Sequence, residues 1–270
     1  MKRLRRAARG RRLALLGALA SLVVPAAAVQ SQTRVDDREA LRLSQDAIGR
    51  KLDGLVFTTA AGERLAIEEL RGRPLVLSLV YTSCYHVCSG LTLQLRKSVA
   101  IARDALGARS FNVLTVGFDT RNDTAARMGQ YARERGVDVP GWTFAATDAA
   151  TMAQLVQAVG FTYFPSPKGF DHITQTTIVD ADGRVVRQVY GQEFAPPLLV
   201  EPLKGLAFGK ALTAGGVEGL LGQVKLLCTI YDPTSGRYRF GYSLIVEIVA
   251  GLLALGTAAA GIAAVARRVR

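Results

Sequence analysis

The chain has 270 residues, enough for one large domain or two small ones, and a formal net charge of +12. Most of this charge lies at the ends, because residues 1–12 contain seven Lys or Arg and residues 267–270 contain three Arg, with no acidic residue in either segment. The remaining residues together carry about +2, so the charge pattern does not indicate nucleic-acid binding and fits basic ends that set membrane topology.

Both ends of the sequence predict membrane targeting. Residues 1–28 combine a basic segment, a short apolar core and an Ala-Ala-Ala site, which are the parts of a cleavable secretory signal; an uncleaved N-terminal anchor is the alternative. Residues 244–266 are apolar apart from Glu247 and are long enough for one transmembrane helix, with a buried core helix as the alternative. The positive-inside rule places the basic tail at 267–270 in the cytoplasm. We therefore expect an inner-membrane protein with a C-terminal single-pass anchor and its body in the periplasm.

The sequence between these ends predicts alternating strands and helices. Residues 29–44 are polar with mixed charge and are expected to form a tether that contains the start of a short helix. Two short apolar segments at 52–57 and 64–67 flank an Ala-Gly turn, which is typical of a small hairpin. An apolar run at 74–80 predicts a buried strand, and helical periodicity follows at 91–106. The later predicted elements are strands at 111–118, 142–145, 173–179 and 184–190 and helices at 125–135, 149–159 and 197–210.

This order predicts an α/β domain with a mixed sheet, because strands alternate with helices and the pattern closes on a hairpin. The strand, thiol turn and helix near its start match a thioredoxin-like fold. We expect that domain over residues 45–212, with the small hairpin as an N-terminal extension. Residues 213–243 are then a connector that leads to the predicted transmembrane helix.

Two cysteines, Cys84 and Cys88, lie between the strand at 74–80 and the helix that follows. Cys84 is expected at the strand-to-helix junction, with Cys88 one helical turn further on and on the same side. The start of a helix lowers thiol pKa values. Such a redox-active pair can form a reversible disulfide or bind a soft metal ion, and two buried, inert cysteines are the alternative.

The two histidines of the chain are His86, between the cysteines, and His172, just before a predicted strand. In thioredoxin-like domains the loop before that strand lies beside the thiol turn. Two thiolates and the His172 imidazole would make a three-coordinate site suited to Cu(I), whereas zinc usually takes four ligands. His86 is expected to project away from Cys84 and to be incidental. Asp171 is predicted either to orient the His172 ring or to be a solvated turn residue.

Three segments together resemble the Sco/SenC family of copper-binding thioredoxin-like proteins: CYHVC at 84–88, FDTRNDT at 118–124 and DHITQTTIVDADGRV at 171–185. The resemblance covers about residues 45–210. It implies that Cys84, Cys88 and His172 bind copper, with Cu(I) as the expected state and binding of Cu(II) left open. It further implies delivery of copper to the binuclear centre of cytochrome c oxidase, or reduction of that centre's cysteines, with an oxidase subunit or another copper protein as partner.

The sequence departs from the family pattern in two places. Family members commonly have proline after each cysteine, whereas this chain has Tyr85 and Ser89. Many are anchored at the N-terminus, whereas here the predicted anchor is C-terminal, which bears on the identity of the client. Asp119 and Asp123 fall on family aspartate positions, and we assign them only loop shaping and helix capping.

Two functions remain open at this point. The favoured one is a metallochaperone rather than an enzyme; the alternative is a thiol–disulfide oxidoreductase that reduces the copper-ligand cysteines of a client. His172 favours copper, since disulfide exchange does not need it, and no proline beside the cysteines is available between Gly169 and Ala195. A peroxidase fits less well, because Tyr81 stands where peroxiredoxins place threonine. Cys228 is the unpaired third cysteine and is predicted to be inert, to pair with another chain or to add a copper ligand.

Overall fold

The computed structural model describes residues 37–84, 87–167, 169–213 and 229–269. The chain divides into two compact units, Met1–Thr33 and Arg34–Arg270, and all described residues belong to the second. The predicted signal at 1–28, together with His86 and Cys228, lies outside the described residues, so these predictions stay predictions.

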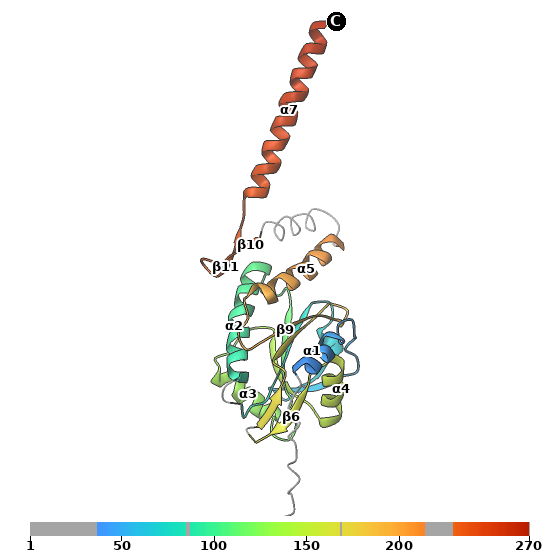
Figure 1. Ribbon diagram of the computed structural model, residues 1–270, viewed down its shortest axis with the longest axis vertical. Coiled ribbons are helices and arrows are strands. Elements are labelled where there is room, and N and C mark those ends of the chain that lie inside the picture. The colour runs from blue at the N-terminus through green and yellow to red at the C-terminus, as the bar shows by residue number, and fades with distance from the viewer. Residues whose placement is uncertain (1–36, 85–86, 168, 214–228, 270) are drawn as a thin grey trace, which may run out of the picture. The chain divides into compact units, whose positions relative to one another are not determined.

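A seven-stranded mixed sheet in the order β2-β1-β5-β4-β3-β8-β9 forms the centre of the second unit (Figure 1). Its middle strands, β3 (Leu75–Val80), β4 (Asn112–Gly117) and β5 (Trp142–Ala146), are parallel. Every residue of β3 is buried, which explains its continuous apolar sequence, since a central parallel strand is covered on both faces. On the other side of β3, β8 (Gln175–Val179) and β9 (Val185–Tyr190) are antiparallel. The predicted mixed α/β sheet is confirmed.

The predicted N-terminal hairpin is also present. β1 (Val56–Thr59) pairs antiparallel with β2 (Arg64–Ala66), and β1 joins the main sheet by pairing with β5. A 3-10 helix, η1 (Ile67–Leu70), leads from the hairpin toward β3. The hairpin therefore extends the central sheet beyond β5.

Two pairs of helices cover opposite sides of the sheet (Figure 1). α2 (Val87–Leu106) and α3 (Ala125–Glu134) lie on one side, where the Thr92 and Tyr131 hydroxyl oxygens are 2.8 Å apart. α1 (Asp37–Gln45) and α4 (Ala149–Val159) lie on the other. Cap residues set the ends of these helices as the sequence predicts: Thr124 begins α3, and α4 lies between the Asp148 N-cap and Gly160.

A buried polar network attaches α1 to the sheet. The Ser44 hydroxyl donates to Gln175 Oε1 at 2.8 Å, and Gln188 Nε2 donates to the Ser44 carbonyl at 3.3 Å. The Gln175 and Gln188 amides also donate to the carbonyl of Val159 at the end of α4. Part of the segment predicted as a tether is thus a helix packed on the fold.

The segment after α5 (Pro197–Thr213) contains a second small hairpin, β10 (Thr229–Asp232) and β11 (Arg237–Phe240). Tyr238 is buried, and its hydroxyl donates to Glu201 on α5 at 2.7 Å. Lys204 Nζ donates to the Thr229 carbonyl at 2.6 Å. This part of the predicted connector therefore packs against α5.

A helix, α7 (Ser243–Val269), forms over the segment that the sequence predicts as a membrane span. Within the described part of the chain, however, no helix is both long and apolar enough to cross a membrane. The C-terminal transmembrane anchor, and the inner-membrane location that depends on it, are therefore not supported.

A third hairpin, β6 (Tyr163–Ser166) and β7 (Gly169–His172), was not expected from the sequence and forms a two-stranded sheet of its own. The sequence does not predict this hairpin because it contains Pro165 and Pro167, and proline within a short apolar segment argues against a strand. His172 consequently ends a strand, where the sequence predicts a loop.

Candidate functional site

The thiol turn lies between β3 and α2, as predicted. Cys84 follows β3, Cys88 is the second residue of α2, and both are buried cysteines that are not joined by a disulfide. The Cys84 N–H donates to the carbonyl of Tyr81 at 3.1 Å, and the Cys88 N–H donates to Cys84 Sγ at 3.4 Å. The sulfur of Cys84 therefore faces the first turn of the helix that carries Cys88.

His172 joins the cysteines from the β6–β7 hairpin. Its Nε2 lies 3.8 Å from Cys88 Sγ, and its Nδ1 lies 3.0 Å from the carbonyl oxygen of Ile173. Because a carbonyl oxygen can only accept, the neutral ring carries its hydrogen on Nδ1, and the Nε2 lone pair points toward Cys88. Asp171 is exposed, and the ring is oriented by the Ile173 carbonyl. Of the two predictions for Asp171, the structure favours the solvated residue.

The electrostatic setting of Cys88 differs from the prediction. The start of a helix was expected to lower its pKa, yet the hydrogen bond with Cys84 and the burial of the side chain raise the pKa of the Cys88 thiol well above its ordinary value. The hydrogen bond with Cys84 is the larger of the two effects, and the side chain is 0% exposed. In its thiol form Cys88 can donate its hydrogen to Nε2 of His172.

Five aromatic side chains, which we call the aromatic wall, enclose the imidazole and the thiol turn. Ring centroids of Tyr81, Phe118 and Phe161 lie 5.9, 5.5 and 5.8 Å from that of His172. Tyr163 and Phe170 complete the wall, each in contact with Phe118. The wall lowers the local dielectric and limits the access of water. Sequence analysis missed it, although the aromatic residues clustered at 161–170 are a signal that could have indicated it.

Asp123 connects the thiol turn to the loop after β4. Its carboxylate accepts hydrogen bonds from the Thr82 N–H at 2.9 Å, the Thr82 hydroxyl at 2.6 Å and the Asp119 N–H at 2.9 Å. Burial raises its pKa, although these hydrogen bonds oppose the shift. Loop shaping is thus the observed role of Asp123, whereas the cap of α3 is Thr124.

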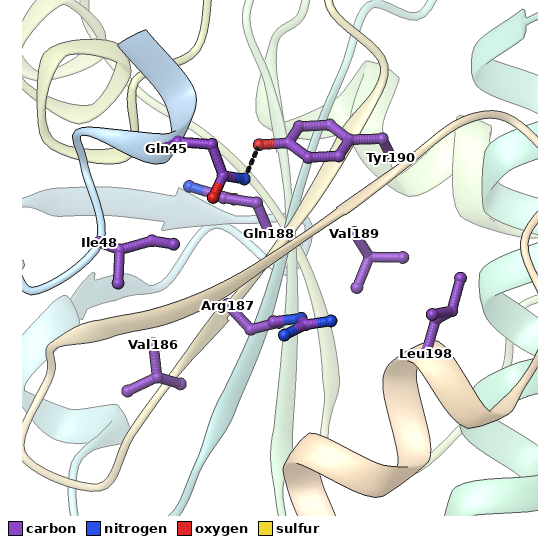
Figure 2. A pocket seen from close by; sticks show the side chains of 8 residues that line it. All are labelled: Gln45, Ile48, Val186, Arg187, Gln188, Val189, Tyr190 and Leu198. Atoms are coloured by element: carbon purple, nitrogen blue, oxygen red, sulfur yellow. Dashed lines mark hydrogen bonds between the residues drawn. The ribbon is translucent and has the colours of Figure 1, made fainter. Parts of the chain in front are cut away.

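A separate pocket of about 430 Å³ lies along β9 (Figure 2). Gln45 of α1 and Leu198 of α5 lie at its two sides, and Gln45 Nε2 donates to the Tyr190 hydroxyl at 2.5 Å. The residues that line it are Gln45, Ile48, Val186, Arg187, Gln188, Val189, Tyr190 and Leu198. None of them is a cysteine, histidine or carboxylate, so the pocket contributes nothing to the thiol site.

The thiol site offers two sulfur atoms and one imidazole nitrogen, a donor set that suits Cu(I). Among the described residues, no three Cys, His, Asp or Glu side chains already stand in a metal-coordinating arrangement. Cys84 Sγ is engaged with the Cys88 N–H, so metal binding requires this sulfur to turn toward the other two donors.

Comparison with known proteins places this site in a family. The model of the SCO1/SenC family matches residues 51–207, which is more than half of the chain. The chain belongs to the SCO1/SenC family. No curated protein sequence matches it.

Several solved structures are similar to this SCO1/SenC chain. A protein of Aquifex aeolicus VF5 is 24% identical, with a TM-score of 0.53, over 58% of this chain and 92% of that one. ScoI of Arabidopsis thaliana, solved with copper bound, is 15% identical, with a TM-score of 0.51, over 58% and 96%. BsSco, described with a disulfide switch as a member of the Sco family of cytochrome c oxidase assembly proteins, is 14% identical, with a TM-score of 0.52, over 58% and 94%. These likenesses confirm the predicted thioredoxin-like α/β fold.

Proposed function

We propose that the chain is a metallochaperone that binds Cu(I) through Cys84, Cys88 and His172 and transfers it to an acceptor protein. The acceptor is the subunit of cytochrome c oxidase, or of a related enzyme, that receives copper. Membership of the SCO1/SenC family supports this proposal, and the Arabidopsis neighbour was solved with copper bound. An exported location is part of the proposal and depends on the sequence pattern of residues 1–28.

The observation that carries the proposal is the tautomer and direction of His172. Its Nδ1 hydrogen is donated to the Ile173 carbonyl, so its Nε2 lone pair is directed at Cys88 Sγ from 3.8 Å. Soft thiolates with one imidazole select Cu(I). The ion replaces the protons of the Cys84 and Cys88 thiols, which leave to solvent, and passes to the acceptor by exchange of ligands without a change in oxidation state.

A second function, disulfide reduction in a client, is favoured by the contact between the two cysteines. The Cys88 N–H donates to Cys84 Sγ, which stabilises a thiolate on Cys84, while Cys88 is fully buried. In this reaction the Cys84 thiolate attacks a client disulfide and releases one client thiolate. Cys88 then loses its proton and attacks the mixed disulfide, which releases the second client thiolate. The client gains two electrons, and Cys84 and Cys88 become a disulfide.

The deciding experiment is titration of the reduced full chain with Cu(I) in competition with a Cu(I) chelator. Wild type is expected to hold one Cu(I) per chain, and His172→Ala is expected to bind it at least tenfold more weakly, since one of three ligands is lost, equivalent to about 1.4 kcal/mol or more. The matched control is His86→Ala, which removes the other histidine and is expected to bind like wild type.

Equal Cu(I) affinity in His172→Ala and wild type would remove His172 from the site and refute the three-ligand proposal. If neither protein binds Cu(I), reduction of a model disulfide by the Cys84–Cys88 pair becomes the function to test.

A further inference from the structure

The backbone carbonyls of both cysteines are held by side chains from outside the thiol turn. The Cys88 carbonyl accepts hydrogen bonds from the Tyr131 hydroxyl at 3.0 Å and from the Thr92 hydroxyl at 2.9 Å. The Cys84 carbonyl accepts one from the Ser89 hydroxyl at 3.3 Å. Two hydroxyl donors, Ser89 and Tyr131, therefore fix the backbone at the two ends of the segment that presents the sulfur atoms.

A single guanidinium group contacts both of these donors. Nη2 of Arg135 donates to the Ser89 hydroxyl at 2.6 Å, and the guanidinium carbon lies 3.5 Å from the centroid of the Tyr131 ring. Nη1 of Arg135 also donates to the Tyr131 carbonyl at 3.4 Å. Arg135 is the C-cap residue of α3, and its side chain is only 11% exposed. The end of α3 is thereby joined to the start of α2 through a partly desolvated cation.

We propose that Arg135, acting through Ser89 and Tyr131, is a positioning residue for Cys84 and Cys88. We call these three residues the Arg135 frame. The frame touches neither sulfur; it fixes the backbone on which the two thiols stand, and so lowers the entropic cost of arranging them around an ion. This inference rests on the proposed copper function for its effect on Cu(I), while its effect on the dithiol itself is independent of copper.

The fork of Arg135 is essential to this role. Arginine donates through several N–H groups in one plane, so it reaches the Ser89 hydroxyl and stacks on the Tyr131 ring at the same time. Lysine keeps the positive charge but offers a single flexible ammonium group. Arg135→Lys therefore removes the guanidinium contacts with Ser89 and Tyr131 and keeps the charge, whereas Ser89→Ala removes the hydroxyl through which Arg135 is connected to the Cys84 carbonyl.

The test compares Ser89→Ala, Arg135→Lys and the double variant in the full chain, with Arg133→Lys as the control. Arg133 is an exposed arginine in the last turn of α3, two residues from Arg135. Each single variant is expected to bind Cu(I) about fivefold more weakly than wild type, the effect of one ordinary hydrogen bond. The double variant is expected to bind Cu(I) no more weakly than the weaker-binding single variant, because both substitutions break the connection between Arg135 and Ser89. Ser89→Ala is expected to keep the melting temperature of wild type.

The reduction potential of the Cys84–Cys88 pair, measured in buffers of reduced and oxidised dithiothreitol, provides the readout without copper. Because the frame fixes the backbone of the dithiol, its loss is expected to favour the disulfide and to make the potential more negative by about 20 mV, equivalent to fivefold for two electrons. Unchanged Cu(I) affinity and unchanged reduction potential in both single variants would overturn the inference. So would a double variant whose loss of Cu(I) affinity is the product of the two single losses. An effect of Arg133→Lys as large as that of Arg135→Lys would overturn it as well. Shifted potentials in a protein that binds no Cu(I) would support the frame and refute the copper function.

Discussion

Asp123 offers a sharp test of how the thiol turn is held in place. Its carboxylate accepts three hydrogen bonds, two from Thr82 and one from the Asp119 N–H, and the residue is only 2% exposed. Thr82 lies two residues before Cys84. Asp123→Ala leaves two backbone N–H groups and one hydroxyl without their acceptor, at the base of the turn that carries the first thiol.

The cost follows from these contacts. A hydrogen bond to a charged group contributes about 1.5–3 kcal/mol. The three together are offset by the cost of burying the carboxylate, which raises its pKa. Thr82 is half-buried, so water can partly replace the lost acceptor there. We therefore expect Asp123→Ala to lower the free energy of unfolding by about 3 kcal/mol. Asp123→Asn keeps an acceptor for Thr82 and should cost about 1 kcal/mol.

Urea unfolding of the reduced, copper-free chain measures the effect. With a denaturant slope of about 2 kcal/mol per molar, Asp123→Ala shifts the midpoint down by about 1.5 M. Asp119→Ala is the matched control, since the Asp119 side chain accepts one hydrogen bond, from Asn122, in the same loop. A midpoint for Asp123→Ala no lower than that of Asp119→Ala would show that the carboxylate does not hold the turn.

Two further predictions concern the free energy of unfolding. Gly160 has a φ of 63°, and a Cβ added there would meet the backbone of Leu43 and Ser44, at 2.7 Å from the Ser44 Cα. We therefore expect Gly160→Ala to lower the free energy of unfolding in urea by about 3 kcal/mol. Gly136 has a similar φ of 59°, but a Cβ added there would meet only the end of the Arg96 side chain. Gly136→Ala should therefore lower the free energy of unfolding by about 1 kcal/mol. Equal losses for Gly160→Ala and Gly136→Ala would contradict the steric argument. Because burial raises the folded-state pKa of Asp123, the pH-dependent part of its contribution to stability is fully present below the ordinary carboxyl value of 3.8 and declines as pH rises through the raised value, where the carboxylate keeps its hydrogen bonds but carries the cost of its burial. As pH rises from 3.8 through the raised pKa of Asp123, the urea midpoint of wild type should therefore fall relative to that of Asp123→Asn. A difference between the two midpoints that does not change with pH would refute a raised pKa for Asp123 in the folded state.

Features that depend on local sequence were predictable. The apolar run of β3 is continuous because both faces of that strand are covered, and the caps at Thr124 and Asp148 act within one turn of their own helices. Cys84 and Cys88 were placed correctly at the start of α2 for the same reason. His172 required one more step, the topology that brings the end of β7 beside the thiol turn.

Features that depend on distant contacts were not predictable. Arg135 bonds to Ser89 across 46 positions of sequence, and no spacing rule connects an arginine at a helix end to a particular serine. The direction of the pKa shift of Cys88 was also not predictable from the sequence, because it is set by the hydrogen bond with Cys84 and by burial, which only the packed structure shows. Pro165 and Pro167 concealed the β6–β7 hairpin and, with it, most of the aromatic wall.

If the chain transfers copper as proposed, the separateness of β6–β7 bears on the order in which its ligands are exchanged. The two sulfur donors belong to the turn between β3 and α2, within the main sheet and its helices, whereas the imidazole belongs to a ribbon paired only with itself. The ribbon can withdraw without breaking any strand pairing of the main sheet. An incoming acceptor would then displace the nitrogen donor first and meet an ion held by two sulfurs, so that exchange proceeds through intermediates that never leave the copper without thiolate ligands.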